Sequence, residues 1–181
     1  MRICLDPGHG GNTGARGNGL IEDALALDFA RRIGHHLRLR GWETVMTRGD
    51  DRFVTLASRG ALAVRTKCGL FLSIHLNAAA SPSARGCECF AAAGDERSLK
   101  IAARLTAALS SMGLKNRGAK YDTQSAHGSL RVLRDTYKNM PALLLEIGFL
   151  TNKADAELLG NKLFREKVSI KVAETLTSIT A

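Results

Sequence analysis

Four side chains suited to metal binding and acid–base chemistry stand at separate points of the chain: His9, Glu22, His75 and Glu146. His9 follows a short apolar run and lies among turn residues in the segment ICLDPGHGG. A histidine in such a loop is a metal ligand, a catalytic base or only a turn residue, and the segment alone leaves these alternatives open. In open α/β sheets, however, ligands bind beyond the carboxyl ends of the strands, where this loop is expected to lie.

The other three residues also lie at critical places in the expected elements. Glu22 opens a helical pattern, where an acid also suits the helix dipole. His75 ends the apolar run LFLSIH, where the alternative is a core histidine hydrogen-bonded to the backbone. Glu146 lies within the run ALLLEIG, and a buried carboxylate there needs a cation or a raised pKa. The alternative partner for Glu146 is an arginine such as Arg131 or Arg134.

Two histidines and one glutamate from separate elements match a catalytic zinc site, which has three protein ligands and one open position. On this interpretation His9, Glu22 and His75 bind Zn²⁺, while Glu146 is held off the metal as a general base. Zinc in such a site lowers the pKa of its bound water towards about 7 and polarises a carbonyl group. The chain contains no HExxH segment, which excludes the thermolysin-type arrangement of ligands.

The elements that must position these residues alternate along the chain. Apolar runs predict strands over residues 3–5, 42–47, 70–77, 86–91, 130–133 and 142–148. Helical periodicity predicts helices over residues 22–40, 56–66, 95–112, 154–159 and 163–179. This order predicts one domain over residues 1–181, an α/β three-layer sandwich with a mostly parallel sheet of about six strands flanked by helices. If the strands are parallel, the four residues lie at the same edge of the sheet.

The surroundings of the expected site are less clearly marked in the sequence. Asp6 and Asn77 flank the candidate ligands and are expected to hold the imidazoles or loops in place, unless they only make local turn hydrogen bonds. Residues 116–129 are polar and contain glycine, which predicts a mobile loop beside the site. The predicted elements use most of the chain between His75 and Glu146 and leave little spare chain for a lid beyond residues 116–129, so we expect activity without an activator.

The composition limits the classes of partner. The chain is 45% hydrophobic and 24% charged, which is ordinary for a folded globular protein, and its longest apolar run, Ala142–Leu145, is too short for a membrane span. A net charge of +9 favours acidic polymers, although the alternative is a solvated surface that aids solubility. Aromatic residues make up only 5% of the chain, which argues against a nucleic-acid partner. The four cysteines lack a metal-binding spacing and are expected to be small buried side chains.

Several motifs resemble those of a known enzyme family. The segment LDPGHGG, Glu22 at a helix start, LFLSIHLNAA and MPALLLEIGFLTN are similar to motifs of the zinc-dependent N-acetylmuramoyl-L-alanine amidases of the amidase-3 type. The resemblance extends over essentially the whole chain. Between these motifs it also includes Arg48, Leu56, Arg59, Gly86, Glu88 and Arg117-Gly118. The departures from the family pattern, at Ala63-Val64, Cys68-Gly69 and Leu76, concern packing and surface positions rather than the ligands.

The resemblance implies that His9, Glu22 and His75 bind zinc and that Glu146 is catalytic. It also implies a peptidoglycan substrate, in which the amide between the lactyl group of N-acetylmuramic acid and L-alanine is hydrolysed. Two alternatives stay open: a zinc peptidase or carboxypeptidase that cleaves another bond of the stem peptide, and an inactive cell-wall-binding module. The presence of all four candidate residues, His9, Glu22, His75 and Glu146, argues against an inactive cell-wall-binding module.

We expect the chain to work as a monomer at the bacterial cell wall, where its basic surface draws it to acidic envelope polymers. Met1 leads directly into the first predicted strand, so the sequence shows no signal peptide. This favours either release of the kind used by phage lysins or a catalytic domain cut from a larger protein.

Overall fold

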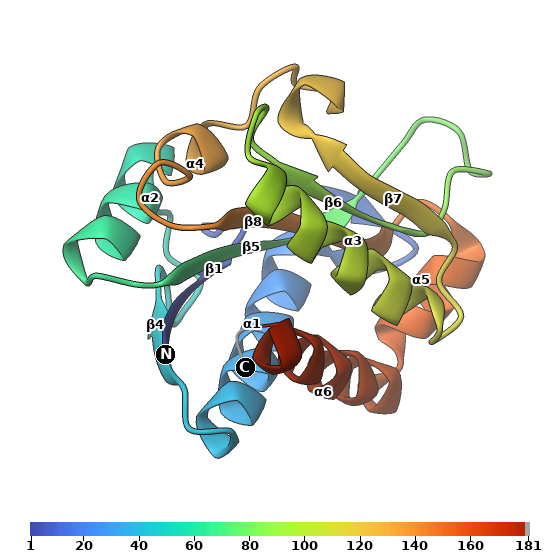
Figure 1. Cartoon of the computed structure of the whole chain (residues 1–181). Helices are drawn as coiled ribbons and strands as arrows, with labels where there is room; N and C mark the ends of the chain where they lie inside the picture. The colour runs from blue at the N-terminus through green and yellow to red at the C-terminus, as the bar shows by residue number, and fades with distance from the viewer. Residues whose placement is uncertain (180–181) are drawn as a thin grey trace.

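The computed structural model describes residues 1–179 and contains a central six-stranded sheet with helices on both faces (Figure 1). Across the sheet the order is β4 (Glu43–Met46), β1 (Arg2–Pro7), β5 (Leu70–Asn77), β8 (Ala142–Phe149), β6 (Cys87–Ala91) and β7 (Asn116–Tyr121). Neighbouring strands run parallel except for β6 and β8, which are antiparallel. The predicted fold class, a mostly parallel α/β sandwich of about six strands, is confirmed.

Each face of the sheet has its own set of helices (Figure 1). One face packs against α1 (Glu22–Leu39), α3 (Glu96–Ser110), α5 (Lys153–Gly160) and α6 (Lys162–Ile179). The other face packs against the shorter α2 (Leu56–Arg65) and α4 (Arg131–Arg134). Within residues 1–179, no helix combines the length and the apolar character that crossing a membrane requires.

Strand periodicity decides which side chains enter which core, because successive residues of a strand point to opposite faces. On β5 and β8 the members of the larger core are Leu70, Leu72, Ile74, Leu76, Leu143, Leu145 and Ile147. The alternate positions point towards the α2 and α4 side, and they include Ser73, His75 and Glu146. The polar residues of the two central strands therefore share the face with the smaller helical cover.

Two of the predicted elements are wrong. Residues 116–121 form β7, the edge strand beside β6, and a short 3₁₀ turn, η1 (Asp122–Gln124), follows it. The strand is hard to recognise because its side chains are half-buried and mostly polar, as an edge position permits. Residues 130–133 do not form a strand, because the chain makes the helical turn α4 there, with Val132 and Leu133 buried in the smaller core. A four-residue apolar run does not distinguish a buried strand from a buried helical turn.

The segment between His9 and α1 also has more structure than the sequence suggests. A two-stranded hairpin, β2 (Arg16–Gly17) with β3 (Leu20–Ile21), leads directly into the helix. At its other end α1 stops before Gly41, whose φ of 78° suits a residue without a side chain. The four cysteines are buried and unpaired, as expected.

Candidate metal centre

The loop that carries His9 is held by two buried arginines. Arg48 donates hydrogen bonds to the carbonyl oxygens of Pro7 (3.0 Å) and Gly8 (2.7 Å), and Arg59 donates to those of Pro7 (2.8 Å) and His9 (2.6 Å). Backbone oxygens that a regular strand would pair are satisfied by these side chains instead. His9 itself has a φ of 58°, so the loop backbone is bent sharply at the residue that carries the imidazole.

Two glycines leave room for the site. A Cβ atom added to Gly8 would lie 2.3 Å from Cε1 of His75, well inside van der Waals contact. A Cβ atom added to Gly14, whose φ is 94°, would lie 2.9 Å from Cγ of His9 and 3.1 Å from Oε2 of Glu22. The backbone therefore passes so close to all three side chains that only glycine fits at these two positions.

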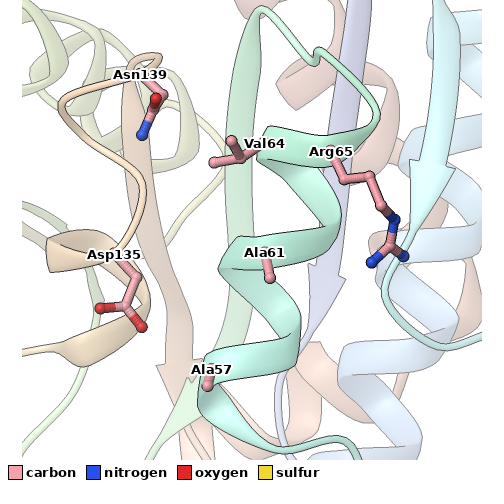
Figure 2. A pocket seen from close by; sticks show the side chains of 6 residues that line it. All are labelled: Ala57, Ala61, Val64, Arg65, Asp135 and Asn139. Atoms are coloured by element: carbon pink, nitrogen blue, oxygen red, sulfur yellow. The ribbon is translucent and has the colours of Figure 1, made fainter.

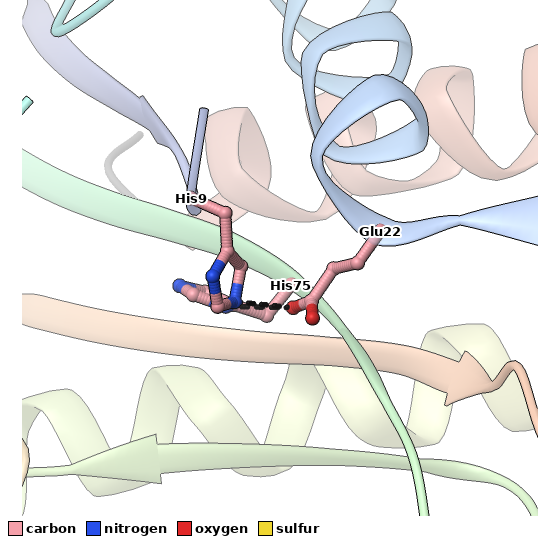
Figure 3. Close-up of side chains that lie close together, drawn as sticks. All are labelled: His9, Glu22 and His75. Carbon is pink, nitrogen blue, oxygen red and sulfur yellow. Dashed lines mark hydrogen bonds and ion pairs between the residues drawn. The ribbon is translucent and has the colours of Figure 1, made fainter. Parts of the chain in front are cut away.

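The carboxylate of Glu22 points towards both imidazoles, which lie next to each other (Figure 3). Its Oε1 atom is 3.0 Å from Nε2 of His9 and 3.0 Å from Nδ1 of His75, while its Oε2 atom accepts a 2.8 Å hydrogen bond from the backbone N–H of Ala15. Burial alone would raise the pKa of Glu22, but the hydrogen bonds from His75 and His9 outweigh burial and hold the pKa well below its usual range. The carboxylate is thus charged and already aimed at the two rings.

The orientation of the His75 ring is set by Ser73 and, through Ser73, by Asp6. Nε2 of His75 lies 3.1 Å from Oγ of Ser73, and that hydroxyl donates a 2.7 Å hydrogen bond to Oδ2 of the fully buried Asp6. Because the Ser73 proton is used on Asp6, the Ser73 oxygen is left to accept a hydrogen bond from Nε2–H of His75. The opposite nitrogen, Nδ1, lies 3.0 Å from Oε1 of Glu22, so it is the His75 nitrogen that can bind a cation together with Glu22.

These three side chains can form one cation site. One ligand atom from each of His9, Glu22 and His75 lies within 4.8 Å of the other two. Two imidazoles and a carboxylate are the donor set of many catalytic zinc sites, and they leave a coordination position open. The residues present therefore fit a zinc ion.

Glu146 supplies a second observation that fits a cation. It is the register partner of His75 on the neighbouring strand, and its buried Oε2 atom has no hydrogen-bond partner among residues 1–179. Burial, together with the charges of Glu22 and Glu88, raises the pKa of Glu146 well above its ordinary value. An unpaired buried carboxylate oxygen beside other carboxylates is costly unless a cation or a donor lies next to it.

The alternative partners considered for Glu146 are engaged elsewhere. Arg134 pairs with Asp122 at 2.6 Å, and Arg131 pairs with Asp135 at 3.3 Å. The alternative interpretation, in which Glu146 forms an ion pair with either arginine, is therefore wrong. Burial in an apolar strand indicated that Glu146 needs a partner, but the sequence could not show which element brings one.

Three residues surround the candidate ligands, and the sequence pattern did not single out one of them, Ser73, for a role. Ser73 could not be distinguished from any other small residue of a buried strand, although it contacts His75 directly. Asp6 was expected near the imidazoles, and it acts on His75 through Ser73 rather than by direct contact. Asn77 donates a 2.6 Å hydrogen bond to Glu88 and also makes a local turn contact with Ala78.

A second surface feature shares none of its lining residues with the candidate metal centre (Figure 2). It is an open groove between α2 and the segment after α4, lined by Ala57, Ala61, Val64, Arg65, Asp135 and Asn139. Its only acid, Asp135, already pairs with Arg131. The groove therefore lacks the set of acid, base and ligand groups found around His75.

The family model described as N-acetylmuramoyl-L-alanine amidase (Amidase_3) matches residues 3–178. The chain belongs to this family. The resemblance inferred from the motifs is thereby confirmed over almost the whole length.

Named members of the family are similar in sequence and in fold. The N-acetylmuramoyl-L-alanine amidase LytC of Bacillus subtilis (strain 168) is 34% identical over 174 residues, which cover 92% of this chain and 33% of LytC. The solved structure of an N-acetylmuramoyl-L-alanine amidase from Clostridium difficile 630 is 27% identical, with a TM-score of 0.90, and the match covers 99% of this chain and 96% of that one. The catalytic domain of CwlV from Bacillus (Paenibacillus) polymyxa var. colistinus is 29% identical, with a TM-score of 0.87 and coverages of 99% and 97%. The chain thus spans a third of LytC but nearly all of these two solved structures.

Proposed function

We propose that this member of the amidase family is a zinc-dependent peptidoglycan hydrolase that cleaves the amide bond between N-acetylmuramic acid and L-alanine of the stem peptide. Family membership supports the coarser statement, an amidase acting on peptidoglycan. The finer statement depends chiefly on one observation, the convergence of His9, Glu22 and His75 beside the unpaired oxygen of Glu146.

In this proposal His9, Glu22 and His75 hold the zinc ion. When bound, zinc would supply Lewis-acid polarisation of the amide carbonyl and would make water more acidic. The rigid arrangement of the loop by Arg48 and Arg59 keeps the ligands in place before the ion arrives, so little reorganisation is needed on binding.

Glu146 acts as the base in the same proposal. Its Oε2 atom takes a proton from the attacking water as the water oxygen joins the carbonyl carbon. The protonated carboxyl group then gives this proton to the nitrogen of L-alanine as the carbon–nitrogen bond breaks. A raised pKa suits the first of these steps, because it makes the carboxylate a stronger base.

A hydrolase of this type acts at the bacterial cell wall, and the net charge of +9 favours attraction to acidic envelope polymers. The main competing function is a zinc peptidase or carboxypeptidase that uses the same residues on another stem-peptide bond. Purified peptidoglycan incubated with the zinc-loaded chain separates the two functions. The amidase releases peptides that begin with a free L-alanine amino group and leaves the sugar chains intact, whereas the peptidase releases other amino termini.

The metal requirement is tested in the same assay. Turbidity of a peptidoglycan suspension should fall with the zinc-loaded chain, stay constant after a chelator is added, and fall again after zinc is restored. Metal analysis should give one zinc ion per chain. Full activity with no bound metal would refute the zinc dependence but would leave the amidase activity standing.

A further inference from the structure

A charged cluster lies one strand beyond Glu146. Glu88 on β6 is the register partner of Glu146 on β8, and the two side chains point to the same face of the sheet. Oε2 of Glu88 is 2.9 Å from Nε of Arg117 and also accepts a hydrogen bond from Nζ of Lys120, both on β7. Asn77 donates to the other oxygen of Glu88 at 2.6 Å. The cluster carries two positive charges and one negative charge, so it has a surplus of positive charge next to the candidate catalytic centre.

The two cations differ from Glu88 in their exposure to solvent. The Glu88 side chain is 6% exposed, whereas Arg117 and Lys120 are 31% and 26% exposed. Burial alone would raise the pKa of Glu88, but hydrogen bonds from Lys120 and Arg117 outweigh burial and lower the pKa. Glu88 therefore stays ionised. It holds the side chains of Arg117 and Lys120 in position from the buried side, and both cations stay partly accessible to solvent.

Arg117 in particular has donors to spare. Its guanidinium carbon lies 4.9 Å from the centre of the Phe149 ring, a cation–π arrangement that fixes the plane of the group. Only Nε is used on Glu88, and within the described part of the chain the two terminal nitrogens of Arg117 donate to no other protein group. A guanidinium with a fixed plane and free terminal donors is well suited to bind a carboxylate through two hydrogen bonds.

We propose that Arg117 and Lys120 form a carboxylate-binding subsite, which selects stem peptides that carry a free carboxylate on the residue following L-alanine. This inference rests on the proposed function. The muramoyl carboxyl group is consumed in the bond to be cleaved, so free carboxylates of the substrate lie on the peptide side. Strands are about 4.8 Å apart, so β7 lies roughly 10 Å from β8. An extended peptide advances about 3.4 Å per residue, which puts a carboxylate one residue beyond L-alanine within reach.

The test uses two synthetic muramoyl peptides that differ only in this group, a free carboxylate in one and a carboxamide in the other. The zinc-loaded wild type should have a KM about ten-fold lower for the carboxylate peptide, since hydrogen bonds between charged partners carry effects of this size. R117Q and K120Q should raise KM for the carboxylate peptide towards that for the carboxamide peptide, with kcat nearly unchanged. K120R should retain most of the preference. K100Q is the charge-matched control, because Lys100 lies exposed on α3, on the other side of the sheet, and should leave both KM values unchanged.

Equal KM values for the two peptides in the wild type would overturn the subsite while leaving the amidase activity intact. An equal loss on both peptides in R117Q and K120Q would also overturn it, because the cations would then serve only to neutralise Glu88. If the chain cleaves neither peptide, the proposed function fails, and calorimetric titration of both peptides into the wild type still decides the subsite. Equal affinity there refutes it, and tighter binding of the carboxylate peptide supports it.

Discussion

His75 and Glu146 are register partners on the adjacent parallel strands β5 and β8, and their side chains point to the same face of the sheet. The candidate metal ligand and the candidate base therefore lie side by side on the two central strands of the sheet. Both strands are buried along almost their whole length, which makes the relative position of the two groups rigid. His9 and Glu22 are then brought to this pair by a loop and by a helix start.

Removal of His75 should remove the metal. H75A takes away one of three protein ligands, so the zinc content of the purified variant should fall well below one ion per chain. Chelation of the wild type should abolish activity but leave the circular dichroism spectrum nearly unchanged, because the two hydrophobic cores do not include the metal ligands. Full zinc occupancy in H75A would exclude His75 from the ligand set.

The two carboxylates should respond differently to the same substitution. E146Q keeps the size of the side chain but cannot take up a proton, so the variant should fold, bind zinc and lose about 10²–10⁴-fold in kcat. E22Q should lose zinc affinity instead, because the amide is a poorer ligand than the charged carboxylate between His9 and His75. Zinc content and kcat, measured for both variants and for the wild type, test this difference. Loss of zinc in E146Q together with its retention in E22Q would reverse the two roles.

Ser73 should matter for metal affinity although it is not a ligand. S73A removes the acceptor for Nε2–H of His75 and should weaken zinc binding by about 10- to 100-fold, as substitutions behind metal-binding histidines do. S73T keeps the hydroxyl group and should restore most of the affinity. Competition with a zinc chelator measures the dissociation constants, and the ring nitrogen shifts of His75 report its tautomer. Equal affinities in S73A and the wild type would show that Ser73 does not position His75.

Asp122 should stabilise the fold in a pH-dependent manner. Its fully buried carboxylate accepts hydrogen bonds from Arg134 and from the amide groups of Ala93 and Leu130. Burial alone would raise the pKa of Asp122, but these hydrogen bonds outweigh it and lower the pKa below the ordinary value of 3.8. The stabilisation is therefore complete above the unfolded-state pKa, and it is lost as the pH falls through the lower folded-state pKa.

Denaturant unfolding at several pH values checks this expectation. D122N should lower the free energy of unfolding by about 1–3 kcal/mol at pH 7, and the difference from the wild type should shrink in strong acid. D135N, which affects only the exposed pair with Arg131, should change the free energy by less than about 1 kcal/mol. A difference for D122N that is the same at pH 7 and in strong acid would contradict the role of its charge.

The net charge of +9 should affect the approach to the cell wall rather than the chemistry. Rates on intact walls should fall as salt rises from low to physiological concentration, because exposed charges are screened beyond about 8–10 Å. Rates on a small soluble muramoyl peptide should change much less over the same range. An equal dependence on salt for both substrates would argue against electrostatic attraction to the wall.

The sequence by itself determined the fold class and the identity of the four candidate residues. The alternation of apolar strands with amphipathic helices leaves few packings other than a layered α/β sandwich, and a histidine or glutamate at the end of a buried strand is conspicuous because burial of such groups is costly. The errors fall where this signal is weak. The edge strand β7 has little apolar surface, and the run at 130–133 is too short to show a period.

Only the tertiary structure decided how these residues are held and what surrounds them. The contacts of Ser73 with Asp6, and of Arg59 with the His9 loop, join segments far apart in the chain. No local pattern encodes such contacts, because they depend on strand order and register. The same holds for the cluster of Glu88, Arg117 and Lys120, which exists only because β6 lies between β8 and β7. The types of residue in a sequence indicate which chemistry the chain can perform. The distances between the side chains are set only when the strands assemble into the sheet.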